Sequence, residues 1–126
     1  MGKNIVLFVL LLLMLAGAIW QSVYVHRATD TLTAPLEEAI QALEQQDAKK
    51  AAQAADKFEA AWQHEKNTYE ALFEHNEVDI ISAYAQKLKS MCAASTIPQA
   101  KALAGEMLFY VDHIRAIDCV GWENIF

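Results

Sequence analysis

The sequence predicts an all-α protein in which a single-pass transmembrane helix precedes a small antiparallel four-helix bundle. Three observations lead to this prediction. Residues 5–25 are uncharged and mostly apolar, residues 28–126 carry apolar side chains at spacings of three and four, and no alternating strand pattern occurs. Short breaks between the amphipathic segments make neighbouring helices antiparallel. Two helix hairpins of this length are also compatible with tetratricopeptide-like packing.

The N-terminal segment is predicted to be an uncleaved anchor that, with its short flanks, covers residues 1–27. At a rise of 1.5 Å per residue, residues 5–25 span roughly 31 Å, about the thickness of the bilayer hydrocarbon. Trp20 and Tyr24 lie near its end, where amphipathic rings favour the headgroup region. Residues 16–18 are small enough for a signal-peptidase site, but the apolar run continues beyond them.

Charge predicts a cell-membrane location with the N-terminus in the cytoplasm and the helical domain, residues 28–126, outside. Lys3 precedes the anchor and only Arg27 follows it closely, so the positive-inside bias is slight. The domain holds eight Lys or Arg against sixteen Asp or Glu, for a net charge of −8. Such a surface repels phosphate backbones, and we therefore expect no nucleic-acid partner.

The first two bundle helices are defined by start signals and by apolar spacing. The first is expected from about Thr33 to Gln45, with Thr33 as a cap and Pro35 in the first turn. The second is expected to begin after Asp47 as N-cap and to end near Phe73. The inward positions are Leu32, Leu36, Ile40 and Leu43 in the first helix, and Ala48, Ala51, Ala55, Phe58, Trp62, Tyr69 and Leu72 in the second.

The third and fourth helices follow the same reasoning. The third is expected from about Glu77 to Ala94, and the fourth from the stop signal at Thr96 and Pro98 to about Ile117. Thr96 is expected to cap the fourth helix. The inward positions are Val78, Ile81, Ala85, Leu88 and Cys92 in the third helix, and Leu103, Met107, Val111 and Ile114 in the fourth.

Four single residues need their own interpretation. Glu65 interrupts the apolar stripe of the second helix; we expect a solvated edge position, with a partner-facing or buried polar group as alternatives. Trp62 continues the stripe and is expected in the core. Cys92 and Cys119 fall near opposite ends of the bundle, roughly 25 Å apart by helix rise. A disulfide needs Cα atoms within about 7 Å, so two free thiols are predicted.

One cluster resembles a site. The up-down topology brings the connection that carries His75, Glu77 and Asp79 to the membrane-proximal end, together with His113. Two imidazoles and two carboxylates could bind a divalent metal. However, Glu77 and Asp79 are two residues apart and point about 200° from each other on a helix. We therefore predict no metal site, and favour helix-end charges and a hydrogen-bonded latch between His113 and the acids.

The C-terminal tail ends in large apolar residues, where disorder is otherwise expected. These side chains pack on their own bundle, which we expect first, insert at the bilayer interface, or contact another protein. The candidate partner-facing residues are Trp122, Asn124, Ile125 and Phe126.

No catalytic apparatus or cofactor motif is found, so we expect no enzyme. His64-Glu65 lacks a second His at the zincin spacing because position 68 is Thr, and no glycine-rich phosphate loop occurs. The expected function is a membrane-anchored, non-catalytic interaction or accessory protein. The alternative is an extracytoplasmic metal- or pH-sensing module that uses His75, Glu77, Asp79 and His113.

Several of these residues also carry a family resemblance. Trp62, the His75-x-Glu77-x-Asp79 motif, His113-Ile114 and the closing Asn124-Ile125-Phe126 resemble an uncharacterised bacterial family, domain of unknown function 4363. The resemblance implies a membrane segment followed by a small helical domain, and no activity. It also implies a multi-pass membrane partner of the YetF-like kind, whose genes often neighbour those of the family. The oligomeric state stays open.

Overall fold

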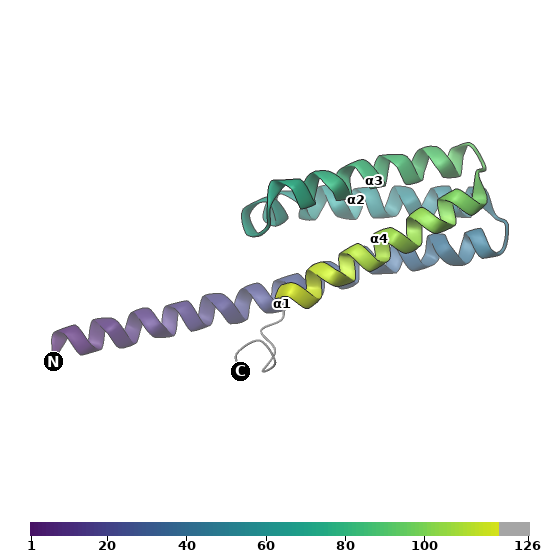
Figure 1. Cartoon of the computed structure of the whole chain (residues 1–126). Helices are drawn as coiled ribbons and strands as arrows, with labels where there is room; N and C mark the ends of the chain where they lie inside the picture. Colours follow the sequence, from purple (N-terminus) through teal and green to yellow (C-terminus); the bar gives the residue numbers. More distant parts are fainter. Residues whose placement is uncertain (119–126) are drawn as a thin grey trace.

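The computed structural model describes residues 1–118, with side chains described for residues 1–116, and this range contains four α-helices and no strand (Figure 1). They are α1 (Gly2–Glu44), α2 (Ala48–Leu72), α3 (His75–Ala93) and α4 (Ile97–Asp118). The predicted all-α class is confirmed. So is the expectation of an apolar N-terminal helix leading to a helical bundle.

One continuous helix of 43 residues, α1, provides both the apolar N-terminal segment and the first bundle helix. Residues 1–20 are all exposed and project from the bundle; we call them the free segment. The end of the bundle from which they emerge is the proximal end, and the opposite end is the distal end. Within the described residues, α1 is the one helix long and apolar enough to cross a membrane, by length and composition.

The predicted start of a bundle helix at Thr33 is wrong, because α1 runs unbroken through this position and through the predicted boundary at residues 27 and 28. The Thr33 hydroxyl does not cap a helix but donates to the Asp30 carbonyl at 3.2 Å. Pro35 lies inside the helix, where its missing N–H costs about 3 kcal/mol. Leu32 and Leu36 are fully buried on either side of it, and each contributes about 1.5–3 kcal/mol, which offsets that cost.

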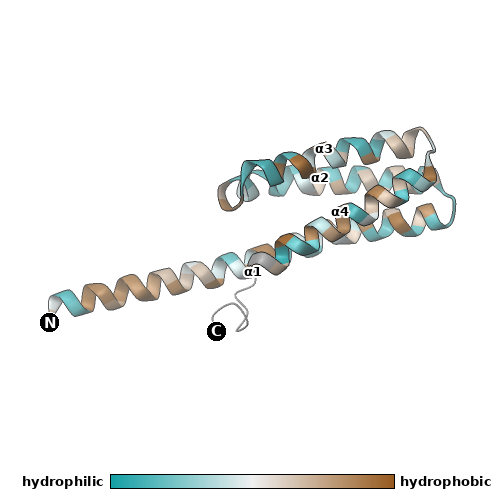
Figure 2. Ribbon diagram, in the orientation of Figure 1, coloured by the Kyte–Doolittle hydropathy of each residue, from teal (hydrophilic) through white to brown (hydrophobic). Residues whose placement is uncertain are grey.

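Each helix packs against two neighbours, so the bundle is closed. α1 packs on α2 and α4, and α3 packs on the same two helices from the other side. Because α4 returns to α1, the chain forms a bundle and not a stack of tetratricopeptide-like hairpins. Figure 2 shows that apolar residues dominate the free segment, whereas polar and apolar residues alternate along the bundle helices.

Two of the three turns use the same helix-ending motif. Gln46 (φ 60°) and Ser95 (φ 56°) both adopt the left-handed conformation just after a helix, and the flanking N–H groups bond back to the last-turn carbonyls. Asp47 caps α2 as predicted, accepting from the N–H three residues on at 3.0 Å. Thr96 does not cap α4. After the left-handed Ser95, the Thr96 hydroxyl points back toward α3 and donates to the Met91 carbonyl at 3.0 Å.

The core confirms the apolar spacing of the last two helices. Trp62 is fully buried, as expected. Cys92 is a buried free thiol, and its burial raises the pKa of that thiol. Cys119 lies outside the described residues. All predicted inward positions of α3 and α4 are buried: Val78, Ile81, Ala85, Leu88 and Cys92, and Leu103, Met107, Val111 and Ile114.

Candidate functional site at the proximal end

The proximal end is built from all four helices. The bundle part of α1 begins there, the short connection between α2 and α3 crosses it, and α4 ends there (Figure 1). This placement follows the predicted up-down order. His75 is the first residue of α3 and His113 lies in the last two turns of α4, so both belong to this end.

The four candidate residues are not gathered into one cluster. Among residues 1–118, no three His, Cys, Asp or Glu side chains lie close enough to hold a metal ion. His75 and Asp79 are exposed, whereas Glu77 is half-buried. No hydrogen bond between His113 and these acids is found among the described residues. The His113 ring instead stacks on Phe109, with ring centroids 6.1 Å apart, so the predicted latch is not formed.

Glu77 faces α4 at a different residue from the one predicted. It lies in the first turn of α3, where its charge offsets the helix dipole as expected. The residue across from it is Tyr110, one turn before His113. Burial and the negative charge of Glu77 together raise the pKa of the Tyr110 hydroxyl.

Glu65 of α2 contacts α1. The Tyr24 hydroxyl of α1 donates to Glu65 Oε2, and His64 Nδ1 lies 3.1 Å from Glu65 Oε1. The Glu65 side chain is only 13% exposed, whereas that of His64 is 84% exposed. The predicted solvated edge position is therefore wrong. α1 continues past the bundle, and its Tyr24 covers this part of α2.

We expect Glu65→Ala to lower the free energy of unfolding by about 1.5–3 kcal/mol, because it removes a partly buried, charge-assisted acceptor from the Tyr24 hydroxyl. Glu70→Ala on the same helix is the matched control. Glu70 pairs with Lys66 at 3.7 Å and is more exposed, so its loss should cost about 0–1 kcal/mol. Urea unfolding of the full chain in detergent micelles measures both. Equal losses of unfolding free energy for the two substitutions would show that the contact between Glu65 and Tyr24 does not stabilise the fold.

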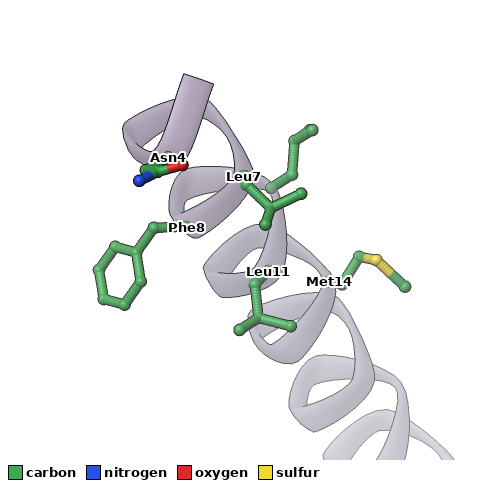
Figure 3. Close-up of a pocket in the computed structure, with 6 residues that line it drawn as sticks. Asn4, Leu7, Phe8, Leu11 and Met14 are labelled. Atoms are coloured by element: carbon green, nitrogen blue, oxygen red, sulfur yellow. The ribbon is translucent and has the colours of Figure 1, made fainter. Parts of the chain in front are cut away.

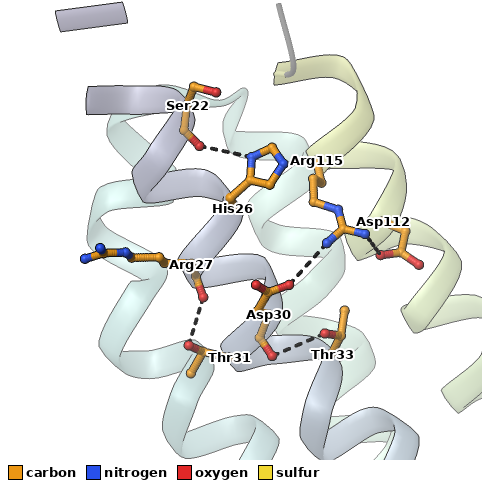
Figure 4. Close-up of polar contacts among 8 residues, drawn as sticks. All are labelled: Ser22, His26, Arg27, Asp30, Thr31, Thr33, Asp112 and Arg115. Atoms are coloured by element: carbon orange, nitrogen blue, oxygen red, sulfur yellow. Dashed lines mark hydrogen bonds and ion pairs between the residues drawn. The ribbon is translucent and has the colours of Figure 1, made fainter. Parts of the chain in front are cut away.

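An ion pair connects α4 to α1 at the same end. Arg115 Nη1 lies 3.2 Å from Asp30 Oδ1, and Arg115 Nη2 lies 3.5 Å from Asp112 Oδ1 (Figure 4). One turn closer to the free segment, His26 Nδ1 donates to the Ser22 carbonyl at 3.2 Å. Of these contacts, the one between Arg115 and Asp30 joins α4 to the part of α1 that continues into the free segment.

Aromatic side chains extend from the bundle core to the proximal end. Trp62 donates from Nε1 to Ser82 Oγ at 2.9 Å, and its ring meets Tyr69 edge-on at 5.4 Å. Tyr69 in turn contacts Phe73, 5.2 Å away, at the connection between α2 and α3. The core is therefore continuous from the centre of the bundle to the proximal connection.

The described hollows do not form an enclosed ligand site. One hollow runs along a single face of the free segment and is open on all other sides (Figure 3). A gap inside the bundle, beside Phe58, Ile81 and Met107, is too small to admit a water molecule. The residues that line the hollow on the free segment are Asn4, Leu7, Phe8, Leu10, Leu11 and Met14.

Comparison with protein-family models matches residues 19–125 to a domain of unknown function, DUF4363. The chain belongs to this family. The match begins close to Gln21, where α1 enters the bundle, so the DUF4363 region covers all four bundle helices. The predicted resemblance to this family is thus confirmed. Searches of curated proteins and of solved structures gave no match.

Proposed function

We propose that this DUF4363 protein is a membrane-anchored, non-catalytic interaction protein whose bundle is held rigidly at the membrane surface. The continuity of α1 carries the proposal. Fifteen of the sixteen exposed large apolar side chains in the described residues lie between Met1 and Val23. An apolar surface of this extent needs an apolar environment, which a bilayer provides. Because the same helix forms part of the core, the bundle cannot turn freely on its anchor.

We place the protein in the cell membrane, with the N-terminus in the cytoplasm and the bundle outside. Lys3 precedes the free segment on the proposed cytoplasmic side. The acidic excess of residues 28–126 supports a translocated domain. Reaction of a cysteine introduced at the exposed Lys49 position with an impermeant reagent in intact cells tests this orientation.

The proposed partner is a multi-pass membrane protein, of the YetF-like kind that the family resemblance implies. A rigid anchor favours such a partner because it presents the proximal end at a fixed height above the bilayer. The candidate contact residues Trp122, Asn124, Ile125 and Phe126 lie outside the described residues, and their role stays a prediction.

Deletion of residues 122–126 is expected to remove a multi-pass protein that co-purifies with the tagged full chain from mildly solubilised native membranes. Circular dichroism should show unchanged helicity, because residues 1–118 form the bundle. Lys49→Ala, at an exposed distal position, is the matched control and should retain the partner. Retention of the partner by the deletion variant would contradict the proposed role of the tail. Absence of any partner from the intact chain would contradict the proposed role of the protein.

A further inference from the structure

All four histidines of the chain lie at the proximal end, one from each helix. His26 directly follows the first buried residue of α1, and His64 lies eight residues before the end of α2. His75 is the first residue of α3, and His113 lies five residues before the end of α4. All four are exposed. We call residues 26–31, 64–79 and 112–116, which include them, the histidine collar.

The histidine collar carries a net negative charge when its imidazoles are neutral. It contains three Lys or Arg against seven Asp or Glu, which gives −4, and four protonated histidines would cancel this charge. Histidine is the side chain that changes charge between pH 5 and 8. The charged groups within the collar are the basic Arg27, Lys66 and Arg115, and the acidic Asp30, Glu65, Glu70, Glu74, Glu77, Asp79 and Asp112.

Each histidine has a carboxylate close by on its own helix or turn. His64 contacts Glu65 at 3.1 Å, and His113 directly follows Asp112, which pairs with Arg115. His75 follows Glu74, and His26 lies one turn before Asp30. Protonation would therefore cancel negative charge at several places around the collar, and not at one point.

The length of the free segment sets the height of the collar in a bilayer. From Ile5 to Trp20 the helix spans about 24 Å, which is less than the hydrocarbon thickness of about 30 Å. Spanning the hydrocarbon from Ile5 requires about twenty residues and so reaches Tyr24, which already packs against the bundle. His26 follows two residues later. The α1 part of the collar therefore lies in the headgroup layer, next to the rest of the proximal end.

We propose that the histidine collar makes a pH-dependent contact with the anionic phosphate headgroups of the bilayer that holds the free segment. At neutral pH the collar is negative, and anionic lipid repels it. As pH falls, the imidazoles gain protons, the repulsion is lost, and each imidazolium can donate to a phosphate oxygen. The contact is lost again as pH rises. This inference rests on the proposed function, because it requires the free segment to be in a bilayer.

The test uses reciprocity: if protonation favours the contact, anionic lipid must favour protonation. The full chain, labelled at histidine, is placed in nanodiscs of phosphatidylcholine alone or with about one third phosphatidylglycerol, and the histidine signals are followed by NMR against pH. We expect anionic lipid to raise the collar titration midpoints by at least about half a pH unit, a roughly threefold change in proton affinity. High salt should reduce this shift.

Gln45→His supplies the matched control, since position 45 is exposed on the distal side of α1. It lies nineteen residues from His26, about 28 Å along the helix, well beyond the Debye length. Its midpoint should not respond to anionic lipid. Equal shifts of the titration midpoints at the collar and at position 45, or no shift at either, would overturn the proposal for the collar. The proposed function would not be affected by that result. Failure of the chain to enter nanodiscs would overturn the proposed function, and with it this inference.

Discussion

Replacement of Trp62 by alanine is expected to lower the free energy of unfolding of the bundle by about 3–5 kcal/mol. The Trp62 side chain is fully buried, meets the Tyr69 ring at 5.4 Å and donates to Ser82 Oγ at 2.9 Å. Alanine leaves a cavity and an unpaired hydroxyl in its place. Since a domain of this size is stable by about 5–15 kcal/mol, this loss is a large part of the total. Urea unfolding of the full chain in micelles, followed by circular dichroism, measures it.

Trp20→Ala provides the matched control for the same change of side chain. Trp20 is 62% exposed on the free segment and stacks only on Tyr24 among the described rings, at 5.7 Å. Its replacement should change bundle stability by less than about 0.5 kcal/mol. Trp62→Phe should fall between the two, because it keeps most of the apolar volume and loses the hydrogen bond. Similar stability of Trp62→Ala and Trp20→Ala would show that the core does not depend on Trp62.

The apolar positions of the bundle could be predicted because helical periodicity can be recognised within a short stretch of sequence. A spacing of three and four places residues such as Ile81, Leu88, Met107 and Val111 on one face, whatever that face packs against. Predicting that these residues are buried requires no knowledge of the helix they pack against. For this reason α3 and α4 were predicted better than the entry of α1 into the bundle.

The start of the first bundle helix was predicted wrongly because the local sequence favours a new helix start there, whereas tertiary packing favours one continuous helix. Thr33 and Pro35 form a common helix-start pattern. In the structure, Leu32 and Leu36 are buried on the same face as Val25 and Ala28, so the apolar stripe passes through Pro35. Packing against α2 and α4 decides the outcome, and it lies outside any short sequence window.

The contacts of the proximal end depend on registers that no single helix encodes. Tyr24 and Glu65 are 41 residues apart in the sequence, and Asp30 and Arg115 are 85 residues apart. The interruption of an apolar stripe by Glu65 was the one available signal, and the structure supports its partly buried interpretation. The predicted His113 latch is not formed because the His113 ring stacks on Phe109, and the Glu77 charge acts instead on the Tyr110 hydroxyl, one turn earlier in α4.

Two arginines in the centre of the free segment, Leu10→Arg with Leu13→Arg, are expected to release the protein from the membrane. Both leucines are more than half exposed, and neither contacts the bundle core. A charged residue at the centre of a spanning helix costs about 2.5–3.5 kcal/mol on insertion scales, so the pair costs roughly 5–7 kcal/mol. Alkaline extraction of membranes should move the variant from the pellet to the soluble fraction.

The matched control adds the same charge to the same helix outside the free segment. Gln41→Arg with Gln45→Arg places one arginine on the exposed distal part of α1 and one at its exposed C-cap, and this variant should stay in the pellet. The comparison separates loss of apolar character in the free segment from a general effect of positive charge. If the Leu10 and Leu13 variant also resists extraction, membrane attachment must come from another part of the chain. The fixed height of the histidine collar would then lose its basis, because that height follows from the length of the inserted helix.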